Sequence, residues 1–173
     1  MRSEIQIEMG VWPLRRPTVA LPVISFVAEA YKRPPEVARI ACVSVTQTAA
    51  EKLVALTRRT AAERAGAGRP RDPTLVRHIY DLHVIRAHYD AAEVAALACE
   101  IMPHDAEVFG NQFPAYREAS MATTLQAIED LRTDPSYARK FNEFRRLMVY
   151  GDNVEYGACI STITALAEKL REA

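Results

Sequence analysis

The stretch RHIYDLHVIR at positions 77–86 places one carboxylate, Asp81, in an apolar run with helical spacing, beside two histidines and two arginines. At about 100° per residue, a narrow polar strip carries Arg77, Asp81 and His88 between two apolar stripes. The stripes consist of Leu75, Ile79, Leu82, Ile85 and Tyr89, and of Val76, Tyr80, Val84 and Ala87. A helix with two apolar faces packs on two sides, so we expect Asp81 to face a crevice.

Two roles fit an aspartate in such a place. Carboxylates are rarely buried unless they are paired with a cation or bind a metal. Arg77, four residues before Asp81, is the obvious partner for a structural ion pair, although Arg before Asp is the weaker order. The alternative is a functional carboxylate. The helix alone leaves both interpretations open.

Cations border the core face of the preceding predicted helix, at 49–65. Lys52 and Arg59 are seven residues apart and share a stripe at the edge of that face, and Arg58 lies further round. The predicted core face comprises Ala49, Ala50, Leu53, Val54, Leu56, Thr57 and Thr60. Lysine can bind phosphate as a point charge and arginine as a planar fork. The alternative is that their apolar stems simply cover the edge of the core.

Other chemistry is disfavoured by spacing. His78, His83 and His88 are five residues apart, whereas zinc-binding helices use spacings of three or four, so ordinary polar roles are expected. The chain has no GxSxG, no GxGxxG and no Gly-Lys-Ser/Thr phosphate loop. The cysteines are odd in number and form no CxxC, which indicates reduced thiols in a cytoplasmic protein.

Composition indicates a soluble globular protein that does not associate with membranes. The 173 residues are 49% hydrophobic and 25% charged, with no apolar run of membrane-spanning length and no signal peptide. The net charge of zero is unevenly divided, at +5 for residues 1–90 and −5 for residues 91–173. A basic region beside an acidic one suits a phosphate-bearing ligand or a partner that docks by charge, or is simply a solvated surface.

The secondary structure predicted from the sequence indicates an α+β protein, with a strand-rich part at 1–47 and a helical domain at 48–173. EIQIEMG and ARIACVSV predict strands, and LPVISFVAEAY either a strand or a short helix. Thr48 and Glu51 have the spacing of a capping box, and a helix is expected from there to about 65. Further helices are expected over 74–88, from an Asp90 N-cap to Pro103, and over 121–131, 135–150 and 154–170. A long loop is expected over 104–120.

TAAEKLVALTRR, the basic loop RPRD, and LVRHIYDLHVI together resemble the central motifs of the AbiEii-type nucleotidyltransferase toxins of bacterial abortive-infection systems. That family has an AEK-x-x-AL-x-x-R helix, a basic loop and an Asp-Leu helix, in this order. A strand with an acidic residue precedes them, and IQIEMG is similar to it. The helical tail also resembles the family's C-terminal region, so the resemblance covers most of the chain.

The resemblance implies roles for individual residues. Lys52 matches the lysine that holds nucleotide phosphates, and either Arg58 or Arg59 matches the arginine that follows it. Asp81 matches the catalytic aspartate, and Glu8 an acidic residue that completes the metal site. The implied site therefore has catalytic Asp81 and Glu8, with Glu8 as a metal ligand, and nucleotide-binding Lys52, Arg58, Arg59 and Arg77.

The implied reaction transfers a nucleotide from an NTP, such as GTP, to an acceptor such as tRNA, with Mg²⁺, and the implied partner is a cognate antitoxin. The family's Gly-Ser turn and Asp-x-Asp strand are missing here, so the chain is expected to be the C-terminal part of a longer toxin or a shortened, inactive derivative. The alternatives are a non-catalytic module that binds a nucleotide or the antitoxin, and a purely structural helical protein.

Overall fold

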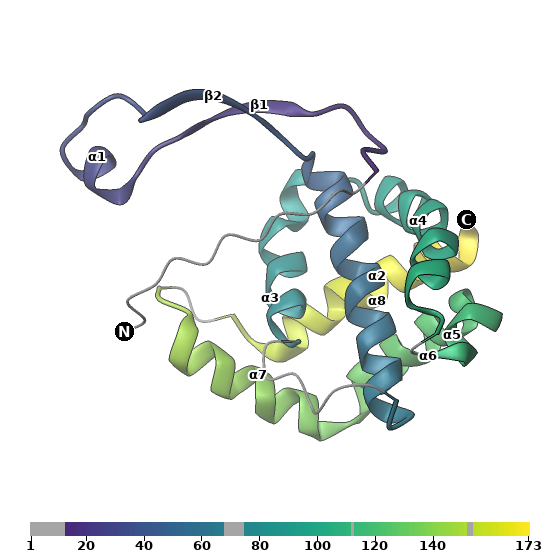
Figure 1. Ribbon diagram of the computed structural model, residues 1–173. Coiled ribbons are helices and arrows are strands. Elements are labelled where there is room, and N and C mark those ends of the chain that lie inside the picture. Colours follow the sequence, from purple (N-terminus) through teal and green to yellow (C-terminus); the bar gives the residue numbers. More distant parts are fainter. Residues whose placement is uncertain (1–12, 68–74, 112, 152–153) are drawn as a thin grey trace. The chain divides into compact units, whose positions relative to one another are not determined.

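The computed structural model describes residues 13–67, 75–111, 113–151 and 154–173. It confirms an α+β chain that is mostly helical, in which a strand-containing N-terminal region precedes a helical bundle (Figure 1). Two compact units are present, Met1–Ser44 and Val45–Ala173. EIQIEMG, Glu8 and the basic loop RPRD lie outside the described residues.

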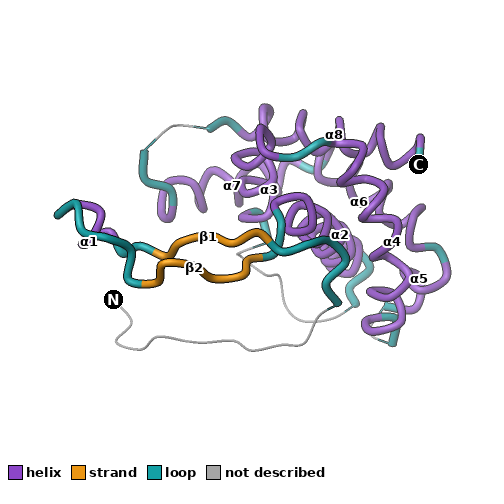
Figure 2. The backbone as a smooth tube through the Cα atoms, turned by 90° about the horizontal axis from the view of Figure 1, so that it is seen from above, coloured by secondary structure: helices purple, strands orange, loops and turns teal. Residues whose placement is uncertain are grey.

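The N-terminal unit is built on an antiparallel hairpin of β1 (Val19–Val23) and β2 (Val37–Cys42), drawn as strands in Figure 2. The register shifts between Leu21 and Val23, on either side of Pro22, which has no backbone N–H to donate to a ladder. Every residue of β1 is exposed, and so is every residue of β2 except Cys42. The hairpin therefore has little core of its own.

A short helix, α1 (Phe26–Ala30), interrupts the connection between the strands. Its N-cap is Ser25, whose Oγ accepts from the backbone N–H of Ala28 at 3.0 Å. The Glu36 carboxylate accepts from both the N–H and the hydroxyl of Ser25. The segment LPVISFVAEAY was predicted to be either a strand or a short helix. It contains part of each, because β1 ends at Val23 and α1 begins after the Ser25 cap.

The second unit is a bundle of helices around α2 and α8 (Figure 1). Its elements are α2 (Val45–Arg64), α3 (Arg77–Val84), the 3-10 turn η1 (Ile85–His88), α4 (Ala91–Phe109), α5 (Pro114–Glu118), α6 (Ser120–Thr133), α7 (Pro135–Met148) and α8 (Tyr156–Glu172). Helices α3, α4 and α6 pack against both α2 and α8, and one apolar cluster joins them. No described helix is long and apolar enough to cross a membrane.

The start of α2 differs from the prediction. The helix begins at Val45, and Thr48 lies inside its first turn, so the predicted capping box does not form. The Glu51 carboxylate instead accepts from the Gln47 side chain at 2.8 Å. Ser44 immediately precedes the helix, and Gln47 follows three residues later. These two residues have the spacing of a capping box, one helical turn before the predicted one at Thr48 and Glu51.

The middle of the bundle is more helical than predicted. The Asp90 N-cap is confirmed, since its Oδ1 accepts from the N–H groups of Ala92 and Glu93. However, α4 continues through Pro103 to Phe109, and α5 occupies part of the expected loop at 104–120. The apolar face of α4 stays buried on both sides of the proline, so its packing outweighs the lost backbone hydrogen bond.

The spacing of apolar residues predicted the core-facing side of α2 correctly and that of α3 in part. All seven residues of the predicted α2 core face are at most 1% exposed. Leu75, just before α3, and Ile79 and Leu82 within it are buried as expected. Of the second stripe, Val76 is buried and Tyr80 packs against the core as expected, but Val84 is 46% exposed and Ala87 is exposed, so the stripe is wrong in its second half. Helix α3 is thus not packed on two sides along its length.

Candidate functional site

Lys52 and Asp81 meet between α2 and α3. The Lys52 Nζ lies 2.7 Å from Asp81 Oδ2, and the two side chains are 26% and 27% exposed. The structural ion pair considered for Asp81 therefore has a different partner from the expected Arg77. Asp81 thus lies on the side of α3 that contacts α2, whereas Arg77, four residues before it, is exposed.

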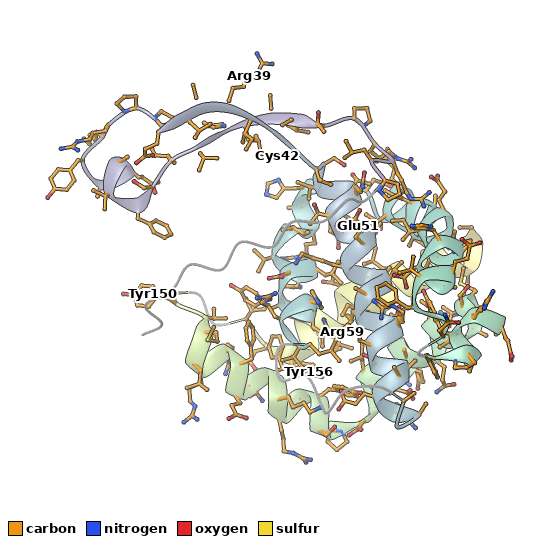
Figure 3. All side chains as sticks on the ribbon, viewed as in Figure 1. Arg39, Cys42, Glu51, Arg59, Tyr150 and Tyr156 are labelled. Atoms are coloured by element: carbon orange, nitrogen blue, oxygen red, sulfur yellow. The ribbon has the colours of Figure 1, made fainter. Side chains whose placement is uncertain are left out.

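A second pair lies beside the first. The Arg59 NH1 is 3.4 Å from His78 Nε2, and Figure 3 shows Arg59 extending from α2. Lys52 and Arg59 are two turns apart on α2, and His78 and Asp81 are one turn apart on α3, so each helix presents its pair on one face. The two helices run in opposite directions along this contact. We call Lys52, Arg59, His78 and Asp81 the α2–α3 ladder.

The ladder is electropositive. Burial, with the positive charges of Lys52, Arg59 and Arg77, lowers the pKa of His78 to about 4, and Asp81 acts in the opposite direction. Burial and the charges of Arg58 and Arg77 also lower the pKa of Arg59. A region whose cations disfavour one another is suited to an anionic ligand, because such a ligand relieves their repulsion.

Arg58 belongs to a different cluster. It lies about 120° round α2 from Lys52, whereas Arg59 lies within about 20° of it. The Arg58 Nε donates to Asp105 Oδ2 at 2.8 Å, and its guanidinium stacks over the Phe109 ring at 3.7 Å. These contacts join α2 to α4 and leave only 14% of the Arg58 side chain exposed. The sequence left open whether Arg58 or Arg59 matches the family's arginine. In the structure Arg59 belongs to the α2–α3 ladder, and Arg58 belongs to the contact with α4.

The described residues do not by themselves fit Mg²⁺. In the described ranges, no three His, Cys, Asp or Glu side chains converge as possible metal ligands. Asp81 supplies one carboxylate, whereas Mg²⁺ takes six oxygen ligands, partly from waters and phosphates. Glu8, the metal ligand expected from the resemblance, lies outside these ranges.

Sequence reasoning missed His78 and treated the three histidines alike. His78 faces Arg59, His83 Nδ1 lies 2.8 Å from the Thr162 hydroxyl on α8, and His88 is exposed. The three-residue spacing from His78 to Asp81 could have shown that these two share a face. Only the packing of α2 on α3 shows that Arg59 lies opposite His78.

The family comparison places this chain in the class of the nucleotidyltransferases. The chain matches the family model "Nucleotidyl transferase AbiEii toxin, Type IV TA system" over residues 1–170, and it therefore belongs to the AbiEii toxin family, as the sequence predicts. No curated protein and no solved structure matches the chain.

Proposed function

We propose that this chain takes part in transferring a nucleotide from an NTP to an acceptor such as tRNA, and that the α2–α3 ladder binds the triphosphate. One observation carries the proposal: Lys52 and Arg59 of α2 meet His78 and Asp81 of α3, and burial together with the surrounding cations lowers the pKa of His78 to about 4. A triphosphate is the anionic substrate of the family's reaction, and it would neutralise this region.

In this proposal the Lys52–Asp81 pair is the reactive part of the ladder. Lys52 exchanges its carboxylate partner for a phosphate oxygen when the nucleotide binds. Asp81 is then available to accept the proton of the acceptor hydroxyl, or to bind Mg²⁺. When bound, Mg²⁺ would neutralise charge on the phosphates, and Glu8 is the further carboxylate ligand that the family resemblance implies.

Substitutions in the intact toxin test these roles. Lys52→Ala and Asp81→Ala should each abolish toxicity in an expressing cell without unfolding the protein. Lys169→Ala is the matched control, since it removes a lysine from an exposed ion pair with Glu172 on α8 and should leave toxicity unchanged. Full toxicity in a folded Asp81→Ala variant would overturn the role of Asp81.

A second candidate is a module that binds a nucleotide or an antitoxin without catalysis. It is favoured by the described residues, among which Asp81 has no carboxylate neighbours that complete a metal site. Titrating GTP and ATP with and without Mg²⁺ separates the two functions. Metal-independent binding without turnover supports the module, and metal-dependent turnover supports the transferase.

The cognate antitoxin and the N-terminal unit complete the proposal. Residues 91–173 carry a net charge of −5, which suits docking of a basic protein partner. We assign the strands of Met1–Ser44 to a nucleotidyltransferase-like sheet. A pull-down with the cognate antitoxin at low and high salt tests the docking, because a charge-driven contact weakens as salt rises.

A further inference from the structure

His78 is the member of the α2–α3 ladder to which the proposed function gives no role. It lies on α3 among the side chains of Lys52, Arg59 and Asp81, and it is largely buried. It approaches Arg59 through one ring nitrogen, Nε2, at 3.4 Å from NH1. Its other nitrogen, Nδ1, is buried and has no hydrogen-bond partner among the described residues.

The direction of this hydrogen bond follows from the chemistry of the two groups. A guanidinium has only N–H donors, so Arg59 donates and His78 Nε2 accepts. An imidazole that accepts at Nε2 carries its proton on Nδ1 when it is neutral. Burial, together with the positive charges of Lys52, Arg59 and Arg77, lowers the pKa of His78 to about 4, so the ring is neutral at physiological pH and Nε2 can accept.

We propose that His78 is a positioning residue, whose Nε2 holds the Arg59 guanidinium in the direction from which it meets the phosphates. A flexible arginine loses side-chain entropy when it binds a ligand, and a hydrogen bond that orients it beforehand reduces that loss. Because His78 is neutral, this contact places no negative charge next to the guanidinium.

This inference rests on the proposed function, so its test begins with the unmodified protein. Calorimetric titration with GTP, and separately with ATP, in excess Mg²⁺ gives the affinity of the wild type. His78→Asn removes the acceptor at the Nε2 position, whereas the amide oxygen of His78→Gln reaches it. We expect His78→Asn to weaken binding about tenfold and His78→Gln to stay within about threefold of the wild type.

A double-mutant cycle with Arg59→Ala shows whether His78 acts through Arg59. In the Arg59→Ala background, His78→Asn should cause no further loss of affinity. His83→Gln is the control, since it changes a buried histidine on the same helix that contacts α8 instead of α2. It should alter the unfolding temperature without altering nucleotide affinity.

Each outcome bears on a different claim. Wild-type affinity in His78→Asn, or the same loss with and without Arg59, overturns the positioning role and leaves the proposed function standing. A wild type that binds neither GTP nor ATP overturns both. Nitrogen-15 NMR of the wild-type imidazole is a test that needs no variant, because a proton on Nε2 at neutral pH would contradict the accepting role.

Discussion

Lys52 and Asp81 are each about a quarter exposed, and this accessibility distinguishes their ion pair from the one between Arg58 and Asp105. The first pair can exchange partners with a ligand from solvent. The second is mostly buried and stacked on an aromatic ring, so its partners stay together. The two ion pairs that α2 forms therefore differ in how easily solvent reaches them.

Arg58→Ala and Arg59→Ala should therefore have different effects. Arg58→Ala leaves the Asp105 carboxylate buried without its cation and should lower the free energy of unfolding by about 3 kcal/mol. Arg59→Ala should chiefly weaken GTP binding. Urea unfolding and calorimetry on both variants check this, and a stable Arg58→Ala protein with lost affinity would reverse the assignment.

His78 should make the protein less stable in acid. Burial, Lys52, Arg59 and Arg77 lower its folded-state pKa from 6.5 to about 4, against the effect of Asp81. Between these values the unfolded chain binds a proton that the folded chain does not. Stability is therefore lost as the pH falls through this window, by up to about 3 kcal/mol, and the loss levels off below the folded pKa.

Urea unfolding at a series of pH values measures this contribution. The wild type should lose more stability than His78→Gln between pH 6.5 and about 4, since glutamine does not titrate. Parallel curves for the two proteins would show that His78 does not titrate with a depressed pKa.

At the scale of elements, the close approach at Gly110 connects α4 to α5. A Cβ built there would collide with the Ala106 carbonyl oxygen and lie 2.8 Å from the Arg117 Cβ. Gly110→Ala should therefore lower the free energy of unfolding by roughly 1–3 kcal/mol.

Gly157→Ala is the matched control for this substitution. It lies in α8 with nothing within 4 Å of the added Cβ, and it should raise the free energy of unfolding by up to about 1 kcal/mol, because alanine favours the helix. Thermal unfolding followed by circular dichroism compares the two. Equal effects would mean that space at Gly110 is not limiting.

At the scale of the whole molecule, the two units differ in how much they bury. The main apolar cluster is formed entirely by residues of Val45–Ala173. In Met1–Ser44, Ala28 is the one buried side chain among the described residues. An isolated two-stranded hairpin is at best marginally stable in water.

Residues 45–173 expressed alone should consequently fold and unfold cooperatively, within about 1 kcal/mol of the helical unit in the full chain. A peptide of residues 13–44 should be largely unstructured by circular dichroism. A folded peptide, or a fragment 45–173 that fails to fold, would show that the units depend on each other.

Features that depend on residues close together in the chain could be predicted from the sequence alone. The helical period predicted the core face of α2, and the side-chain chemistry of Asp90 predicted the start of α4. The ordered motifs around Lys52 and Asp81 predicted the family. These signals are carried by residues within a few turns of one another, so they can be recognised without knowledge of the fold.

The pairing of the charged groups, in contrast, depends on how the helices pack. Lys52 and Asp81 are 29 residues apart, and Arg58 and Asp105 are 47 apart. The packing of α3 and α4 on different sides of α2 determines these pairs, and it also carries α4 through Pro103. Local spacing favoured Arg77 as the partner of Asp81. The contact between α2 and α3 brings Lys52 there instead, because burying the apolar faces of the two helices sets their orientation.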